Sequence, residues 1–453
     1  MNPLTNIKSI YFIGIGGIGM SALARYFNTQ GVLVAGYDKT PTPLTADLEK
    51  EGIKIHFEDD IQQIDKTATV IVYTPAIPDS HAELNYYRDN GYNVVKRSDV
   101  LNWITENAFT IGIAGTHGKT TTTSMTAHIL RHTGYGCNAF LGGIASNYDT
   151  NFWSDEKNVV VVEADEYDRS FLKLSPNIAV ITAVDPDHLD IYGTAAEVLK
   201  AFGQYADKIK DGGILIQKLG TTVNTSSTNK TIWTYAYDQH EASYHTSNLK
   251  VVDGSYHFDL VHPDGVIKDV VLNMGGLHNV ENATAAIAIA LSLNIDTEKI
   301  KEAVAAFKGV KRRFEYKIKT PSKVLIDDYA HHPEELNALI SGVRSIYPGE
   351  KMVLVFQPHL YSRTQDQCDG FVSTLDKADE VILLPIYPAR ELPIQGVTSD
   401  MLIDKMKLTN KKVMSKEALF EWAASSTDKL IVMAGAGDID ACITKVKDII
   451  TNK

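Results

Sequence analysis

Residues 111–123, IGIAGTHGKTTTT, join a buried strand to a helix through a loop that contains glycine. The expected strand, loop and helix are Ile111–Ala114, Gly115–Gly118 and Lys119–Arg131. A strict phosphate-binding loop would carry Gly at position 113, where this chain has Ile113. The working parts remain, because the glycines expose backbone amides, Lys119 can reach the β- and γ-phosphates, and the Thr120 hydroxyl can bind Mg²⁺. The stretch predicts a nucleoside triphosphate site in an α/β domain.

A second feature is a strand that stops at acidic residues. The valines of Val159–Val162 are followed directly by the acidic segment Glu163–Glu166. An apolar strand that ends at a carboxylate is how enzymes with a phosphate loop place a metal ligand beside the phosphates. We expect Glu163 to be that ligand, because it lies nearest to the strand. His188, in an acidic segment after the expected strand Ile178–Ala183, is a candidate second metal or phosphate ligand.

The N-terminal part carries another glycine motif. Residues 14–19, GIGGIG, match the spacing G-x-G-x-x-G between a short buried strand at Ile10–Ile13 and a helix expected at Met20–Gln30. Such glycines permit a tight turn and bring backbone amides close to a diphosphate at the helix N-terminus. Asp38, at the end of the next expected strand, lies where an acid would meet a ribose or a base. The motif alone does not distinguish NAD from another nucleotide diphosphate.

Two polar segments of the C-terminal part follow expected strands. They are residues 327–333, DDYAHHP, and residues 357–363, QPHLYSR. Polar residues at the carboxyl ends of strands mark a ligand crevice in α/β sheets. Arg312 and Arg313, near the start of this part, are candidates to neutralise a phosphate. The expected strands here are Val324–Ile326, Met352–Phe356, Glu380–Leu384 and Lys429–Met433.

The chain has 453 residues, of which 44% are hydrophobic and 22% charged, as in ordinary globular proteins. This length favours several domains, and the alternation of short apolar runs with helical stretches favours mostly parallel sheets covered by helices. Thr231–Val261 differs, because it alternates like antiparallel strands. The net charge of −12 argues against nucleic-acid binding, and no apolar run reaches the roughly 20 residues of a membrane helix. The three scattered cysteines without zinc spacing favour a reducing cytoplasm.

Together, these motifs identify the chain as similar to the Mur ligase family. The matching segments follow the family order over essentially the full length: Gly14–Ser21, Gly115–Thr123, Glu163–Glu166, Asp187-His188, His278-Asn279, Arg312-Arg313, Asp327–His332 and His359–Arg363. GIGGIGMS, DDYAHHP and QPHLYSRT most resemble the members that act on L-alanine. The resemblance implies an α/β chain of three domains. These are a Rossmann-like UDP-sugar-binding domain over 1–107, a P-loop-type ATP-binding domain over 108–314 and a Rossmann-like ligase domain over 315–453.

The resemblance also implies the reaction and its residues. ATP and Mg²⁺ would serve to join L-alanine to the lactyl carboxylate of UDP-N-acetylmuramate through an acyl phosphate, in cytoplasmic peptidoglycan synthesis, with no nucleic acid, membrane insertion or obligate protein partner. The implied catalytic residues are Lys119, Glu163 and His188, and the implied metal ligands are Thr120, Glu163 and His188. The implied ATP-binding residues are Gly115, Thr116, His117, Gly118, Lys119, Thr120, Thr121, Asn279, Arg313 and Asp328. The implied UDP-sugar-binding residues are Gly14, Gly16, Gly17, Gly19, Met20, Ser21 and Asp38, and those on the amino-acid side are His332, His359 and Arg363.

Three alternatives stay open at this point. A related ligase attaches a recycled tripeptide to the same sugar nucleotide and shares most of the motifs. An NAD-dependent oxidoreductase would use residues 14–19 but would leave the loop at Lys119 unexplained. A binding module driven by ATP would need no acceptor site in the C-terminal part. Phosphate release measured with L-alanine or tripeptide as acceptor separates these functions.

Overall fold

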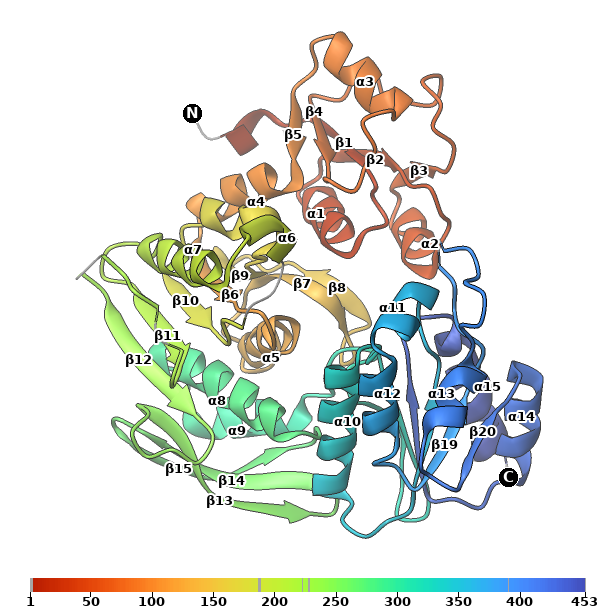
Figure 1. Ribbon diagram of the computed structural model, residues 1–453. Coiled ribbons are helices and arrows are strands. Elements are labelled where there is room, and N and C mark those ends of the chain that lie inside the picture. The colour runs from red at the N-terminus through yellow and green to blue at the C-terminus, as the bar shows by residue number, and fades with distance from the viewer. Residues whose placement is uncertain (1–2, 186–188, 222, 227–228, 390, 453) are drawn as a thin grey trace. The chain divides into compact units, whose positions relative to one another are not determined.

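The computed structural model describes residues 3–185, 189–221, 223–226, 229–389 and 391–452. The chain forms three β-sheets with helices packed against them (Figure 1). Its contacts group into two units. The first unit consists of Met1–Asn248, Phe258–Val271 and Val280–Phe307, and the second consists of Leu249–His257, Leu272–Asn279 and Lys308–Lys453.

The first sheet has the strand order β3-β2-β1-β4-β5, and all its paired strands are parallel. Its strands are β1 (Ser9–Ile13), β2 (Leu33–Tyr37), β3 (Lys54–His56), β4 (Val70–Tyr73) and β5 (Val94–Lys96). Its helices are η1 (Pro3–Asn6), α1 (Ile18–Thr29), α2 (Pro43–Lys50), α3 (Ala82–Asp89) and α4 (Arg97–Glu106). Phe27 of α1 packs with Phe12 on one face, and Tyr87 of α3 packs with Tyr11 on the other. Helices on both faces of a parallel sheet confirm the expected Rossmann-like arrangement.

The second sheet has ten strands in the order β15-β14-β13-β12-β11-β10-β6-β9-β7-β8. They are β6 (Phe109–Ala114), β7 (Asn138–Ala145), β8 (Thr150–Trp153), β9 (Val159–Glu163), β10 (Ile178–Ile181), β11 (Ile214–Lys218), β12 (Thr231–Ala236), β13 (Tyr244–Val252), β14 (Ser255–His262) and β15 (Gly265–Leu272). The helices are α5 (Lys119–His132), η2 (Tyr167–Lys173), α6 (Leu189–Tyr192), α7 (Ala195–Asp207), α8 (Leu277–Ser292) and α9 (Thr297–Ala306). Because β10, β6 and β9 are parallel neighbours, the segments that follow them leave the sheet at the same edge.

The expectation of antiparallel strands across Thr231–Val261 is wrong at its start. β12 pairs in parallel with β11, and its last residues, Tyr235 and Ala236, pair in parallel with β13. Alternation of apolar and polar residues reports that one face of a strand is buried. It does not report the direction of the neighbouring strand.

The third sheet has the order β16-β17-β21-β18-β19-β20, with β16 antiparallel to β17 and the other pairs parallel. Its strands are β16 (Glu315–Lys319), β17 (Val324–Asp328), β18 (Met352–Phe356), β19 (Glu380–Leu383), β20 (Lys411–Val413) and β21 (Leu430–Ala434). Its helices are α10 (Pro333–Ile346), α11 (Tyr361–Asp366), α12 (Cys368–Leu375), α13 (Ser399–Lys405), α14 (Lys416–Ser425) and α15 (Ile439–Thr451). All four expected strands are present. β16 and β20 were not predicted, because these edge strands carry charged residues and lack a continuous apolar run.

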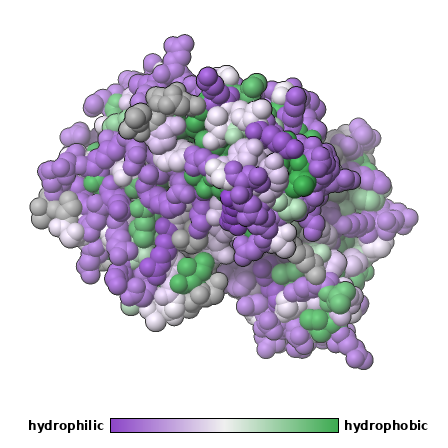
Figure 2. Space-filling model, turned by 90° about the horizontal axis from the view of Figure 1, so that it is seen from above, coloured by the Kyte–Doolittle hydropathy of each residue, from purple (hydrophilic) through white to green (hydrophobic). Residues whose placement is uncertain are grey.

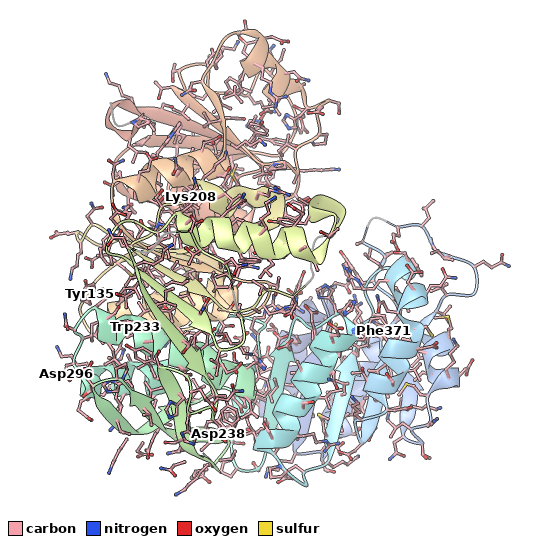
Figure 3. All side chains as sticks on the ribbon, turned by 60° about the vertical axis from the view of Figure 1, so that its left-hand side comes forward. Tyr135, Lys208, Trp233, Asp238, Asp296 and Phe371 are labelled. Carbon is pink, nitrogen blue, oxygen red and sulfur yellow. The ribbon has the colours of Figure 1, made fainter. Side chains whose placement is uncertain are left out.

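The core of the second unit is exemplified by Phe371 of α12, which is buried with its ring centroid 5.5 Å from that of Phe356 (Figure 3). The face in Figure 2 is mostly hydrophilic, and hydrophobic residues appear on it as separate small groups.

The free cysteines Cys137, Cys368 and Cys442 are all buried. Among the described helices, none is long and apolar enough to span a bilayer.

Candidate active site

The phosphate loop leaves β6 after Ala114 and enters α5 at Lys119. Gly115 and Gly118 have φ angles of +135° and +82°, which side chains of L-residues rarely allow. Gly118 also lacks room for a side chain, because a Cβ there would lie 2.7 Å from Oδ1 of Asn282. Conformation and space therefore both require glycine at the turn into α5. No local signal in the sequence points to Asn282, which lies more than 160 residues away in α8.

Lys119 is held by two acceptors in the first unit. Its Nζ donates to the carbonyl oxygen of Gly115 at 2.6 Å and to Oε1 of Glu166 at 2.7 Å. The Glu166 side chain is 2% exposed, and its Oε2 has no hydrogen-bond partner in the described part of the chain. Glu166 belongs to the acidic segment after β9, for which the sequence predicted a role only at Glu163. The structure makes it the counter-charge of the loop lysine.

Thr120 and Glu163 meet beside the loop. The Thr120 hydroxyl lies 3.1 and 3.0 Å from the two carboxylate oxygens of Glu163, the last residue of β9. Desolvation raises the pKa of Glu163, although Lys119 and the hydrogen bond from Thr120 favour its charged form. A desolvated carboxylate that needs positive charge, next to a hydroxyl oxygen, suits Mg²⁺, which takes one or two carboxylates together with substrate phosphates.

The metal prediction has a third member, His188, which lies outside the described residues. Among the residues that are described, no group of three His, Cys, Asp or Glu side chains is placed to hold a metal ion. Thr120 and Glu163 therefore provide a partial ligand set. Such a set fits a cation whose remaining ligands come from the substrate and water.

The remaining loop residues contact the segment after β10. Oγ1 of Thr116 accepts a hydrogen bond from the Asp185 amide at 3.2 Å, and His117 Nε2 lies 3.8 Å from the Asp185 carboxylate. Thr116 is buried and His117 is exposed, so Thr116 fixes the loop while His117 stays accessible. Thr121, in the first turn of α5, is half-buried.

The N-terminal glycine turn follows β1. Gly14, with φ of +87°, donates its amide to the carbonyl oxygen of Tyr37 at 2.7 Å. The Gly16 amide donates to Oδ2 of Asp38 at 2.7 Å, and Oδ1 of Asp38 accepts from Thr40 at 3.1 Å. Asp38 thus holds the glycine turn itself. Gly17 then caps α1 without a side-chain hydrogen bond.

Met20 and Ser21 lie in the first turns of α1 and are both buried. The Ser21 hydroxyl donates to the carbonyl oxygen of Ile18 at 2.9 Å and lies 2.9 Å from Nδ2 of Asn151, while Met20 belongs to the hydrophobic core. The structure therefore gives both side chains packing contacts. Their assignment to the UDP-sugar site stays a prediction.

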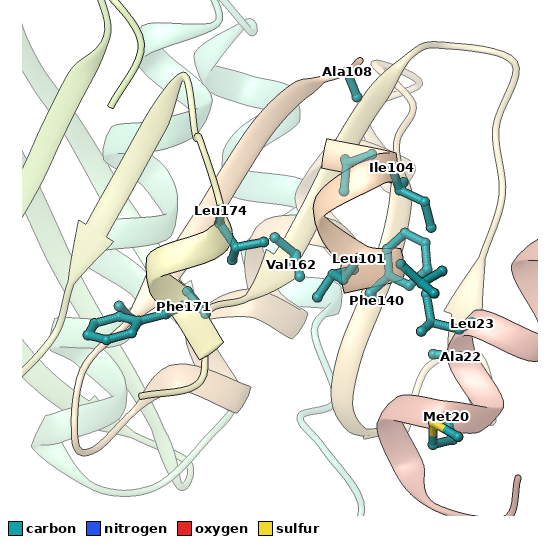
Figure 4. Close-up of a cluster of buried hydrophobic side chains, with 14 of the residues drawn as sticks. Met20, Ala22, Leu23, Leu101, Ile104, Ala108, Phe140, Val162, Phe171 and Leu174 are labelled. Carbon is teal, nitrogen blue, oxygen red and sulfur yellow. The ribbon is translucent and has the colours of Figure 1, made fainter. Parts of the chain in front are cut away.

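A pocket of about 250 Å³ lies in the first unit between α1, α4, β7 and β9. Its apolar wall includes Leu23, Leu101, Phe140 and Val162, which face one another in Figure 4. Its charged lining is Arg97, Glu163 and Asp165. The pocket therefore connects the helix after the glycine turn with the acidic end of β9.

In the second unit, Asp328 ends β17 and anchors the chain before β16. Its carboxylate accepts hydrogen bonds from the amides of Phe314 at 2.7 Å and Ala330 at 2.8 Å. Desolvation raises the pKa of Asp328 to about 6, against the effect of these bonds and of Arg313. The Arg313 guanidinium lies 5.7 Å from the ring centroid of Tyr329. Two residues predicted to bind ATP, Arg313 and Asp328, are thus neighbours.

Asn279, the third ATP-binding prediction outside the loop, lies in the first turn of α8. Its side chain is buried, and its Nδ2 donates to the carbonyl oxygen of Gly275 at 2.6 Å. The Asn279 side chain therefore supports the turn that begins α8.

The predicted amino-acid residues lie at strand ends of the third sheet. Nη1 of Arg363 is 3.3 Å from Nδ1 of His359. The His359 ring centroid is 5.9 Å from that of His331, and the half-buried His332 is the N-cap of α10. Desolvation lowers the pKa of both His331 and His359, and Arg363 lowers it further. His359 therefore contacts Arg363 and lies near His331. The residue predicted from the sequence was His332, the next residue along the chain.

Comparisons with known proteins show the family of the chain. Residues 9–108 match the model of the Mur ligase family, catalytic domain, residues 113–290 the Mur ligase middle domain, and residues 312–437 the Mur ligase, glutamate ligase domain. A UDP-N-acetylmuramate–L-alanine ligase of Cytophaga hutchinsonii is 49% identical, covering 98% of this chain and 97% of that protein. One of Porphyromonas gingivalis is 48% identical, covering 97% and 98%.

Solved structures show the same fold. A UDP-N-acetylmuramate–alanine ligase of Thermotoga maritima has a TM-score of 0.80 and 28% identity, covering 98% of this chain and 99% of that chain. A murein peptide ligase of Psychrobacter arcticus has a TM-score of 0.68 at 22% identity over 98% and 99% of the two chains, which supports the fold alone.

Proposed function

The chain belongs to the Mur ligase family, and we propose that it joins L-alanine to the lactyl carboxylate of UDP-N-acetylmuramate in peptidoglycan synthesis. Similarity over nearly the whole of both chains to relatives that carry this name supports the proposal. The family match replaces the alternative of an NAD-dependent oxidoreductase. We also propose domains at 1–107, 108–314 and 315–453, and each of the three family matches lies mostly within one of them.

The chemistry follows from what amide formation requires. A carboxylate is a poor acyl donor, because oxide is a poor leaving group. Transfer of the γ-phosphoryl group from ATP to the lactyl carboxylate gives an acyl phosphate and ADP. The amine of L-alanine then attacks the acyl carbon, an amide bond forms, and inorganic phosphate leaves with the bonding electron pair.

Lys119 is the cation that would meet the β- and γ-phosphates of ATP. It already lies at the N-terminus of α5, paired with Glu166. Carboxylate and phosphate repel each other, so a fixed ammonium beside them lowers the barrier as negative charge gathers on the transferred group. Thr120 and Glu163, with His188, would hold Mg²⁺. When bound, Mg²⁺ would neutralise charge on the phosphates.

Further predicted nucleotide and acceptor residues belong to the second unit. We assign Asn279, Arg313 and Asp328 to ATP. We assign His332, His359 and Arg363 to the L-alanine side. The lowered pKa of His359 keeps its imidazole neutral near pH 7, so that it can accept a hydrogen bond from an ammonium or amine.

A turnover assay tests the proposal. Purified protein is supplied with UDP-N-acetylmuramate, ATP and Mg²⁺, and phosphate release is measured with L-alanine or with the recycled tripeptide as acceptor. We expect release with L-alanine and a product whose mass equals the two substrates minus water. Release that depends on the tripeptide alone would assign the protein to the other branch of the family. We place the reaction in the cytoplasm, in keeping with three free cysteines.

A further inference from the structure

Arg97, the first residue of α4, was not singled out in the sequence but lies at the glycine turn. A Cβ added to Gly19 would lie 2.6 Å from Nη1 of Arg97. Gly19 has no positive φ, so its backbone conformation does not call for glycine, and the atom that a Cβ would meet is the end of the Arg97 side chain. The motif glycine therefore makes room for a guanidinium against the first turn of α1.

The charge balance around Arg97 is incomplete. Within the described residues, its ion-pair partner is Asp165, with Nη2 3.9 Å from Oδ2, which is too long for a hydrogen bond. The Arg97 side chain is 27% exposed and lines the pocket. A cation at a helix N-terminus is unfavourable, because the helix dipole is positive there. An anion that enters the pocket would relieve this repulsion, because it would bind both the Arg97 guanidinium and the N-terminus of the helix.

Glu163 lines the same pocket, and its place there bears on the orientation of a bound UDP-sugar. The substrate of the proposed reaction carries two anionic groups, the diphosphate and the lactyl carboxylate. The lactyl carboxylate has to reach Thr120 and Glu163, where phosphoryl transfer takes place. The diphosphate is then the group left for Arg97. The apolar wall at Leu101, Phe140 and Val162 suits the methyl groups of the acetyl and lactyl substituents.

From this arrangement we infer that Arg97 is the side-chain cation that binds the diphosphate of the sugar nucleotide, beside the backbone of the glycine turn. The inference rests on the proposed function. A guanidinium can donate two parallel hydrogen bonds to phosphate oxygens, whereas its contact with Asp165 is long and accessible to solvent. The diphosphate would therefore displace Asp165 from Arg97.

The test compares ligands that differ in the diphosphate. Binding of UDP and of uridine is measured by ligand-observed NMR, which reads millimolar affinities, for the wild type, Arg97→Ala and Arg97→Lys. We expect Arg97→Ala to weaken UDP binding about 10- to 100-fold and uridine binding less than about twofold, since hydrogen bonds to charged groups contribute on this scale. Arg97→Lys should retain part of the UDP affinity, because it keeps the charge but loses the paired geometry.

Arg88→Ala is the matched control. Arg88 lies over the ring of Tyr73 at 5.1 Å, in the same part of the chain and outside the pocket, so its removal should leave both affinities unchanged. Unchanged UDP binding in Arg97→Ala, or equal weakening of UDP and uridine, would overturn the inference. Failure of the wild type to turn over UDP-N-acetylmuramate would overturn the proposed function, and the two outcomes are read in separate assays.

Discussion

Lys119 and Glu166 form an ion pair across 47 residues of sequence, with Nζ 2.7 Å from Oε1. The carboxylate is 2% exposed, so the pair is shielded from water. Lys119 also donates to the carbonyl oxygen of its own loop, at Gly115. The position of the cation that would meet the phosphates is therefore set by a residue outside the loop, on the segment that follows β9.

Glu166→Ala should raise the KM for ATP by about 10- to 100-fold, because a hydrogen bond to a charged group contributes about 1.5–3 kcal/mol. Glu166→Gln keeps an acceptor for Lys119 and should keep most of the activity. Steady-state kinetics with ATP varied at saturating UDP-sugar makes the comparison. Equal loss in both variants would mean that the charge of Glu166, and not the position that it gives Lys119, is what the reaction needs.

Lys119→Ala should abolish measurable turnover while leaving UDP binding largely intact. The loss of one group that stabilises transition-state charge costs about 10²- to 10³-fold in kcat. The variant leaves Glu166 buried without its partner, so the double variant Lys119→Ala with Glu166→Gln is the control for folding. Calorimetry with UDP measures the affinity of the UDP-sugar site. Loss of UDP affinity in a folded double variant would contradict the assignment of two separate nucleotide sites.

Glu163→Gln should raise the Mg²⁺ concentration needed for half-maximal activity and lower kcat at least about tenfold, since it removes a metal-binding charge and keeps the shape. A magnesium titration of the initial rate measures both effects. The same titration on Asp165→Asn is the comparison. An unchanged magnesium requirement in Glu163→Gln, with an altered one in Asp165→Asn, would move the ligand to Asp165.

His128 should make the stability of the first unit depend on pH. It is buried, with its ring nitrogens 2.9 Å from the carbonyl oxygen of Ala303 and 2.9 Å from the Tyr148 hydroxyl, and burial lowers its pKa to about 4. Between about pH 6.5 and pH 4 the unfolded chain binds a proton that the folded chain does not. The stability that neutral His128 contributes is therefore present above about pH 6.5 and is lost as the pH falls towards 4.

Denaturant unfolding of wild type and His128→Gln measures this effect. We expect the variant to be about 1–3 kcal/mol less stable at pH 7.5, from the lost hydrogen bonds. The difference should shrink by about 2 kcal/mol at pH 4.5, since one pKa unit corresponds to about 1.4 kcal/mol. A difference that stays constant with pH would show that His128 has an ordinary pKa.

Elements whose signals are local could be predicted from the amino-acid sequence. The strand, loop and helix around residues 111–131 were predicted because glycine conformation, strand burial and the first turn of a helix depend on residues close together in the chain. The glycine turn at 14–19 and the strand ending at Glu163 follow the same rule. The Mur ligase family could be identified for the same reason, since its motifs are short segments in a set order.

Contacts between side chains of different segments could not be predicted in this way. Glu166 rather than a phosphate partners Lys119, Arg97 lies against Gly19, and His331 rather than His332 faces His359. The direction of β12 and the edge strands β16 and β20 also depended on neighbours. Each of these contacts joins residues that only the packing of helices and sheets brings together. No periodicity or spacing along the chain encodes which of several polar side chains will meet, because that choice is made by the backbone positions of distant elements.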